Sequence, residues 1–370
     1  MTLVPPFIAN LKPYETARSV DEIRRLYGFS RVIKLASNEN PLGPSPLAIK
    51  AMSEALQGVN LYPTGGARLR AELARQFEVK PENVIAGSGS EGIMSNIFRA
   101  FLEDDDEALT ADATFIGFRV LAQSRGVAYR TVPLRDWRFD LPALARAVNE
   151  RTKIVYLANP NNPTGTIFTR QEFDEFYRHI PERVLIILDE AYFEFAKDNP
   201  RYPDSMHYRY DNVITLRTFS KAYGLAGVRI GYGFAHESLI SALLKVKLPF
   251  EPSSIAEAAG MAALSDREFL HRTLENNARG MRFLMKELKD LRIKTVPSEA
   301  NFVLTLWPSE EAAANLVEAL LRGGIIVRPM TAYGVPNGIR ISVGAPEENE
   351  LLVESLSKAM KSEEVLLCTR

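Results

Sequence analysis

Cysteine and histidine are scarce in this 370-residue chain, and this limits the kinds of site that it can hold. The one cysteine, Cys368, lies in the last three residues, which excludes an internal disulfide framework and a cysteine-rich metal site. The four histidines lack the spacing of metal ligands, so we expect no metal centre. Low cysteine usage fits a reducing compartment, and the cytoplasm is the expected location.

Long apolar runs and a charge imbalance are also missing. No stretch approaches the roughly 20 apolar residues that a membrane span needs, and the first ten residues do not resemble a secretory leader. The net charge of -1 gives no electrostatic reason to expect a nucleic acid or an acidic membrane as partner. With 46% apolar and 25% charged residues, the composition is that of an ordinary soluble globular protein.

Strand-like and helix-like segments alternate over residues 84–235, which predicts an α/β fold with a mostly parallel sheet flanked by helices. After residue 264 the pattern changes to a long helix over 266–291 and strands over 301–306, 325–328 and 339–343. We therefore expect a large domain over 36–264. A smaller α+β domain is expected from 265–370, joined by an N-terminal arm over 1–35.

Lys221 follows a β-type run over residues 212–216. Burial at a strand exit can remove the proton of a lysine, which then acts as a nucleophile and can form a Schiff base with an aldehyde. The hydroxyl groups of Thr218 and Ser220 and the guanidinium group of Arg229 suit a phosphate. Together they suggest pyridoxal 5'-phosphate (PLP) held on Lys221, although a surface lysine in a glycine-rich turn is the alternative for this segment alone.

A glycine motif over residues 87–92 lies between an expected strand over 83–86 and an expected helix over 93–102. It matches G-x-G-x-x-G, in which glycines and a helix N-terminus let the backbone approach an anion. The anion could belong to PLP, or to NAD with Asp112 as the ribose contact. The acidic run over 103–107 is expected to be a solvated helix end.

Polar and aromatic residues follow several of the expected strands. Asn162 follows the strand over 153–157, and Asp189 ends an apolar run over 184–188 that is typical of a buried parallel strand. A buried carboxylate needs a partner, which the N–H group of a pyridinium ring would supply. Tyr192 could reach a ring hydroxyl group, and Phe115 could stack on a flat ring.

Arg328 and Arg340 occupy apolar strands near the expected domain junction. An unpaired guanidinium group is costly there, and arginine suits the recognition of carboxylates and phosphates. We expect these two residues to bind anions, with an internal salt bridge as the alternative.

Taken in order, these residues resemble the fold-type I PLP-dependent aminotransferases over almost the whole chain. Within this group, residues 11–14, 35–44, 326–334 and 339–344 are similar to segments of the histidinol-phosphate aminotransferase family. The resemblance implies the conversion of L-histidinol phosphate and 2-oxoglutarate into imidazole-acetol phosphate and L-glutamate, by a ping-pong mechanism.

The resemblance also implies residue roles. Lys221 would carry PLP and move the substrate proton, Asp189 would hold the pyridine nitrogen protonated, and Tyr192 and Asn162 would bind the ring oxygen. Phe115 would stack on the ring. The implied phosphate ligands are Ser90, Glu91, Thr218, Ser220 and Arg229, with Tyr62 reaching across a homodimer interface to the neighbouring subunit's cofactor. The implied substrate residues are Tyr14, Asn38, Arg328 and Arg340, of which Arg340 would bind the glutamate carboxylate and Arg328 and Tyr14 the substrate phosphate.

Four alternatives remain open from the sequence. An aromatic amino acid aminotransferase or a threonine-phosphate decarboxylase would share the fold and most of these residues. An NAD-dependent dehydrogenase would use the glycine motif but leave Lys221, Asp189 and Asn162 unexplained. A catalytically silent regulator of the same fold is disfavoured, because the chemical groups are intact and no DNA-binding domain precedes Tyr14.

Overall fold

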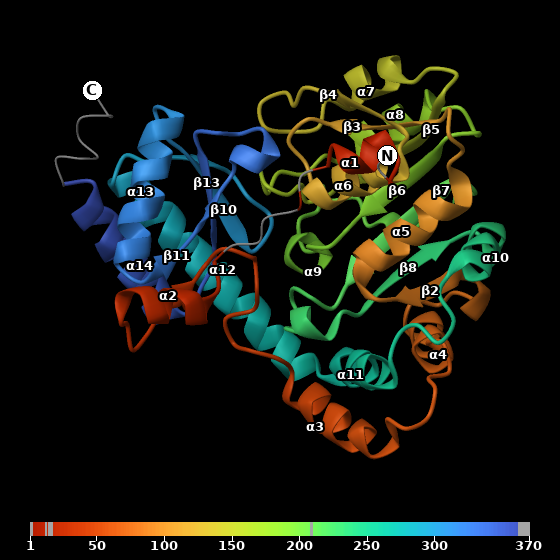
Figure 1. Ribbon diagram of the computed structural model, residues 1–370, viewed down its shortest axis with the longest axis horizontal. Coiled ribbons are helices and arrows are strands. Elements are labelled where there is room, and N and C mark those ends of the chain that lie inside the picture. The colour runs from red at the N-terminus through yellow and green to blue at the C-terminus, as the bar shows by residue number, and fades with distance from the viewer. Residues whose placement is uncertain (1–2, 12, 14–17, 208–209, 362–370) are drawn as a thin grey trace.

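The protein, as seen in a computed structural model, is an α/β structure built on a seven-stranded sheet (Figure 1). The structure describes residues 3–11, 13, 18–207 and 210–361. The strand order is β2-β8-β7-β6-β5-β3-β4, and all strands run parallel except β8, which is antiparallel to β2 and β7. The expected mostly parallel sheet is confirmed. Its strands are β2 (Val84–Gly87), β3 (Glu107–Ala111), β4 (Ala128–Val132), β5 (Thr152–Ala158), β6 (Leu185–Asp189), β7 (Val213–Thr218) and β8 (Gly231–Ala235).

Several helices, among them α4, α5, α6, α7 and α10, pack on this sheet through their apolar faces. The helix α5 packs on β2 and β8 and lies beside α6 and α10, while α11 packs against α3 and α4. The helices up to α11 are α1 (Pro6–Ala9), α2 (Val20–Tyr27), α3 (Pro46–Ala55), α4 (Ala67–Gln76), α5 (Gly89–Phe101), α6 (Ile116–Arg125), α7 (Leu141–Ala147), α8 (Arg170–Arg178), α9 (Phe193–Ala196), α10 (Glu237–Val246) and α11 (Ser254–Ser265).

A second group of elements follows the long helix α12 (Arg267–Asp290) and forms the left part of Figure 1. A four-stranded sheet of order β12-β13-β10-β9 packs with α12, α13 and α14 around a separate apolar core. Its elements are β9 (Lys294–Val296), β10 (Phe302–Leu306), α13 (Glu310–Arg322), β12 (Arg328–Pro329), β13 (Gly338–Ser342) and α14 (Pro346–Ala359).

The N-terminal strand β1 (Ile33–Lys34) pairs in parallel with β11 (Ile325–Ile326). Residues 33 and 34 thus lie beside a strand of the C-terminal part of the chain. The exact division into 36–264 and the two flanking segments stays a prediction.

Three local expectations need correction. The strand expected over 325–328 is two short strands in different sheets, β11 and β12, with Val327 between them. The glycine motif is not a loop between strand and helix, because α5 begins at Gly89. The acidic run is not all solvated. Glu107 is buried at the start of β3, where it is held by Arg130, Thr152 and Asn149.

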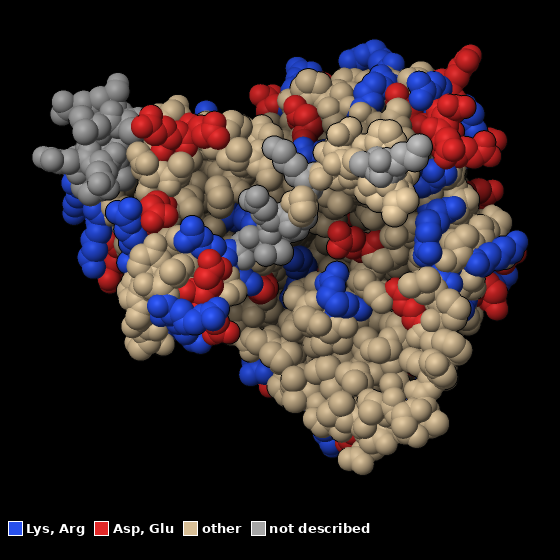
Figure 2. Space-filling view, viewed as in Figure 1, with Lys and Arg blue, Asp and Glu red and all other residues tan. Residues whose placement is uncertain are grey.

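Charged side chains of both signs cover the upper and left parts of one face of the molecule, but few lie at the bottom, over α3 and α11 (Figure 2).

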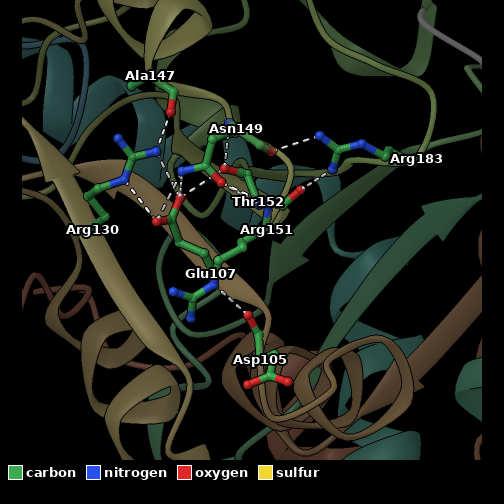
Figure 3. A network of polar contacts seen from close by, with 8 residues as sticks. All are labelled: Asp105, Glu107, Arg130, Ala147, Asn149, Arg151, Thr152 and Arg183. Carbon is green, nitrogen blue, oxygen red and sulfur yellow. Dashed lines mark hydrogen bonds and ion pairs between the residues drawn. The ribbon is translucent and has the colours of Figure 1, made fainter.

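Figure 3 shows the network around Glu107, in which Arg130 donates two hydrogen bonds to the carboxylate, at 2.8 and 2.9 Å. Because Glu107 has these partners, its pKa stays below the usual value despite the opposing effect of burial. Among the described residues, no helix is both long and apolar enough to cross a membrane.

Candidate active site

A cavity of ≈ 160 Å³ lies at the carboxyl edge of the seven-stranded sheet. The carboxyl ends of parallel strands meet at one edge, and open α/β sheets bind ligands there. The cavity is lined by residues predicted from the sequence (Ser90, Glu91, Phe115, Asn162, Asp189, Tyr192, Thr218, Ser220, Lys221 and Arg229) and by others that were not predicted (Tyr156, Ala158, Pro160, Ala191 and Ala226).

One part of the cavity is built to hold an anion. Ser90 and Glu91 belong to the first turn of α5, where backbone N–H groups have no partner within the helix. The hydroxyl groups of Thr218 and Ser220 lie 3.0 Å apart, and Nη1 of Arg229 donates to Oγ of Ser220 at 3.4 Å. Backbone N–H groups, hydroxyl groups and a guanidinium group thus gather in one place.

Two glycines make this close approach possible. A Cβ atom on Gly89, whose φ is +78°, would lie 2.8 Å from Nη2 of Arg229. A Cβ atom on Gly231 in β8 would lie 2.4 Å from the backbone nitrogen of Ser90. The glycines therefore let Arg229 and β8 pack directly against the start of α5.

Asp189, the last residue of β6, is buried in the cavity wall. Its Oδ2 accepts a hydrogen bond from the hydroxyl group of Tyr156 at 2.7 Å, and its Oδ1 accepts one from the N–H group of Ala191 at 3.2 Å. Both donors are neutral, so burial raises the pKa of Asp189 to about 6. Such a carboxylate gains most from a cationic N–H donor placed in the cavity.

Lys221 lies in the turn after β7 and points its amino group into the same cavity. Nζ donates a hydrogen bond to the carbonyl oxygen of Ser37 at 3.0 Å. Burial, together with the positive charges of Arg340 and Arg229, lowers the pKa of Lys221 to about 8. Its amino group is thereby available as a nucleophile and base near neutral pH.

Tyr192 and Phe115 both line the cavity, and their roles toward a ring stay predictions. The buried hydroxyl group of Tyr192 accepts a hydrogen bond from Nδ2 of Asn38 at 2.8 Å, so Asn38 contacts Tyr192. Phe115 precedes α6, and a side chain at Gly117 would collide with its ring at 2.4 Å. Asn159 bonds the backbone of Phe168, as expected for turn formation, but Asn161 also joins the turn to the distant residues Ala113 and Thr114, which plain turn formation does not explain.

Arg340 is buried under the rings of Phe302 and Tyr333. Its guanidinium group donates to the side-chain oxygen of Asn162 and, at 2.8 Å, to the carbonyl oxygen of Ala36, while its buried Nε has no hydrogen-bond partner. These partners are neutral, so the charge of Arg340 is available for an anion beside Asn162.

Arg328 is the Cα partner of Arg340 across β12 and β13, which places the two side chains on the same face of the sheet. Arg328 lines a second, larger cavity of ≈ 760 Å³, together with Arg119 and Arg18. The second cavity thus has a cationic lining that includes a residue of the small sheet.

Among the predicted residues that the structure describes, Asn38, Arg328, Arg340 and Tyr62 do not line this cavity. Tyr62 is 82% exposed, and its ring stacks on that of Phe250 with the ring centres 4.3 Å apart. Tyr14 lies outside the described residues. Asp112, the ribose contact of the NAD alternative, accepts hydrogen bonds from the backbone N–H groups of Ala113 and Leu134, as a turn residue does.

Sequence reasoning missed a buried ion pair beside the site. Arg217 of β7 contacts Glu190 at 2.8 Å and Asp204 at 2.9 Å, and its guanidinium carbon lies 3.4 Å from the ring centre of Phe193. Glu190 follows Asp189, and Arg217 precedes Thr218. The pair therefore ties together the ends of the two strands that carry site residues.

The donor set of the cavity fits PLP. The anion-binding groups suit a phosphate, the buried Asp189 suits a protonated ring nitrogen, and Lys221 suits an aldehyde. An NAD pyrophosphate would use only the first of these three features. The chemistry of the lining thus favours PLP over the dinucleotide.

Comparison with known proteins also indicates an aminotransferase. The model of the family "Aminotransferase class I and II" matches residues 30–356. The histidinol-phosphate aminotransferase of Anaeromyxobacter sp. (strain Fw109-5) is 43% identical over 97% of this chain and 100% of that protein. Histidinol-phosphate aminotransferase 2 of Carboxydothermus hydrogenoformans is 40% identical over 97% of this chain and 99% of that protein.

A solved structure is similar over the same length. The crystal structure of histidinol-phosphate aminotransferase from Sinorhizobium meliloti in complex with pyridoxal-5'-phosphate superposes with a TM-score of 0.88 at 30% identity. The match covers 98% of each chain. The similarity therefore includes both sheets and the elements that line the cavity.

Proposed function

The chain belongs to the aminotransferase class I and II family, and we propose that it transfers the amino group of L-histidinol phosphate to 2-oxoglutarate with PLP as cofactor. The products are imidazole-acetol phosphate and L-glutamate. The observation that carries the chemistry is Lys221, an amino group of lowered pKa in the cavity that also holds Asp189. Full-length relatives with this activity in their names support the choice of substrate.

The residues of the cavity would divide the work of holding the cofactor. Arg229, Thr218, Ser220 and the first turn of α5 would hold its phosphate, while Asp189 would keep its ring nitrogen protonated. Tyr192 and Asn162 would bind the ring oxygen, and Phe115 would stack on the ring. When bound, PLP supplies a protonated ring that takes up the electron pair released at the substrate carbon.

Lys221 performs the proton movement. With its pKa lowered to about 8, Nζ can accept the proton from the carbon that bears the amino group and return a proton later in the turnover. Arg340 binds the carboxylate of glutamate or 2-oxoglutarate beside Asn162. Arg328, on the same face of the sheet, is assigned to the substrate phosphate together with Tyr14.

A homodimer is part of the proposal. Large apolar side chains are exposed around α3 and in the segments next to Tyr62 and Phe250, and the face over α3 and α11 carries few charges (Figure 2). The exposed set includes Leu47, Ile49, Leu56, Val59, Leu61, Leu248 and Phe250. A second copy covering this face would remove these side chains from water and bring Tyr62 to the neighbouring site.

The cytoplasmic location expected from the low cysteine content belongs to the same proposal.

The first test is a product assay with purified protein and PLP. We expect L-histidinol phosphate and 2-oxoglutarate to yield L-glutamate, and the visible absorption of bound PLP to fall when L-histidinol phosphate is added without a keto acid. Phenylalanine and tyrosine as donors, and carbon dioxide release from threonine phosphate, are the controls. Turnover confined to the aromatic donors, or decarboxylation alone, would replace the proposed substrate and keep the fold and cofactor.

A further inference from the structure

Tyr156 lies in the middle of β5 and is fully buried, yet its side chain lines the cavity. Its hydroxyl group donates the 2.7 Å hydrogen bond to Oδ2 of Asp189. The ring is held from the other side by Phe118, which stacks on it at 4.4 Å with an angle of 17° between the rings. The backbone oxygen of Tyr156 accepts a hydrogen bond from Oγ1 of Thr110 at 2.8 Å. The hydroxyl group is therefore fixed against one oxygen of the carboxylate.

We propose that Tyr156 is a positioning residue that keeps Asp189 ionised and in place as the partner of a protonated pyridine nitrogen. This inference rests on the proposed function, since Asp189 needs such a partner only when PLP binds. Only an ionised carboxylate is a pure hydrogen-bond acceptor. The ability of Asp189 to accept a hydrogen bond from the N–H group of a pyridinium ring therefore depends on the groups that stabilise its negative charge.

The groups around Asp189 show why one hydroxyl group matters. Burial raises the pKa of Asp189, and the negative charge of Glu91 in α5 adds to this rise. The hydrogen bond from Tyr156, the N–H group of residue 191 and the charge of Lys221 after β7 act in the opposite direction. Removing the Tyr156 hydroxyl group therefore moves the pKa of Asp189 upward, toward neutral pH, where the protonated form is a poor partner for a pyridinium ring.

The test is the binding of PLP to the apo-protein in the variant Tyr156→Phe, which keeps the ring and its stack on Phe118. We expect the dissociation constant of PLP at pH 5 to rise about tenfold, because an upward shift of about one unit in the pKa of Asp189 reduces the ionised fraction of the carboxylate about tenfold at that pH. The acidic limb of the pH dependence of PLP binding should move upward by about one unit, because Asp189 would then be protonated at higher pH. Both readouts are independent of turnover.

Tyr202→Phe is the matched control. Tyr202 is also buried, and its hydroxyl group donates at 2.7 Å to the backbone oxygen of Asn159 instead of to Asp189. We expect the acidic limb to stay in place in this variant. An equal shift in both variants would mean that any buried hydroxyl group near the site has this effect, and would overturn the inference.

A double-mutant cycle separates an effect through Asp189 from a structural one. In the background Asp189→Asn, the further change Tyr156→Phe should raise the dissociation constant of PLP by about threefold or less, because the acceptor is no longer charged. The same tenfold loss in both backgrounds, or no loss in either, would overturn the role of Tyr156 and leave the proposed function intact. Failure of the unmodified protein to bind PLP would overturn the proposed function itself.

Discussion

At the scale of single residues, the surroundings of Lys221 decide whether it can act as a nucleophile. Its amino group is buried, and Arg340 and Arg229 add positive charge, so that the pKa falls from 10.5 to about 8. A lysine on the surface would be protonated at neutral pH almost completely. The same burial that makes the ammonium ion costly thus prepares the free amine for chemistry.

This lowered pKa predicts the pH dependence of PLP capture. The amount of PLP fixed to the apo-protein by borohydride after a short incubation should rise with pH and reach half its maximum near pH 8, since the deprotonated amine is the reacting form. The measurement is the absorbance of the reduced adduct on the protein. Lys221→Arg should fix none, and a midpoint close to 10.5 would show that Lys221 is not perturbed.

The sequence identified residues whose chemistry was unusual for their position and missed those that looked ordinary. Lys221, Asp189 and Asn162 follow strands, where polar groups suggest a site, and the structure brings them into one cavity. Tyr156 was missed because it lies inside a strand that is buried on both faces, where a tyrosine is typical of the core. Arg217 was missed because its partner Glu190 directly follows the neighbouring strand β6, and no local pattern reveals this contact.

At the scale of elements, the contact between β8 and the start of α5 forms the anion-binding part of the cavity. Helix boundaries are hard to place from sequence, and the glycine motif was expected to be a loop although α5 begins inside it. The reason lies in a distant residue. Gly231 leaves room for the backbone of Ser90. This contact joins two positions that are far apart in the sequence, so neither segment alone predicts it.

Gly231→Ala should push α5 away from β8. The added Cβ atom would lie 2.4 Å from the nitrogen of Ser90 and 2.6 Å from the carbonyl carbon of Gly89, and backbone atoms cannot move aside cheaply. We expect a loss of about 1–3 kcal/mol in the free energy of unfolding, as for other overpacked sites, and weaker binding of PLP.

The control for this variant is Gly227→Ala, because no atom lies within 4 Å of a Cβ atom built at Gly227. Thermal unfolding of the two apo-proteins, followed by PLP titration, provides the comparison. Unchanged stability and PLP affinity in Gly231→Ala would contradict the importance of this contact.

At the scale of the whole molecule, the exposed Tyr62 is the residue that links the proposed dimer to the chemistry. It stacks on Phe250 at the surface and contributes nothing to the cavity of its own chain. A tyrosine assigned to the cofactor phosphate but placed outside the cavity requires a second subunit. The proposal therefore makes each active site a product of two chains.

Mixed dimers can test this arrangement. Lys221→Ala and Tyr62→Phe each remove a group from both sites of a homodimer, but a mixed dimer contains one site with both groups intact. After equal amounts of the two variants are unfolded and refolded together, we expect about one quarter of the unmodified activity, because about half of the dimers are mixed and each has one complete site. The assay compares this mixture with the two variants refolded separately.

An activity of the refolded mixture equal to the average of the separate variants would contradict a shared site. The mass of the assembly in solution provides an independent check, since a stable monomer of 41.4 kDa with full activity would contradict it as well.

The parallel pair of β1 with β11 also has a consequence for synthesis of the chain on the ribosome. Ile33 and Lys34 are made before any strand of the seven-stranded sheet, but their partners Ile325 and Ile326 are made almost 300 residues later. At typical translation speeds of about 5–20 residues per second, the first strand waits roughly 15–60 s for its partner. The seven-stranded sheet, whose strands all lie between them in sequence, can form during this interval. The N-terminal segment thus joins the fold late, after the strands that form the cavity have been made.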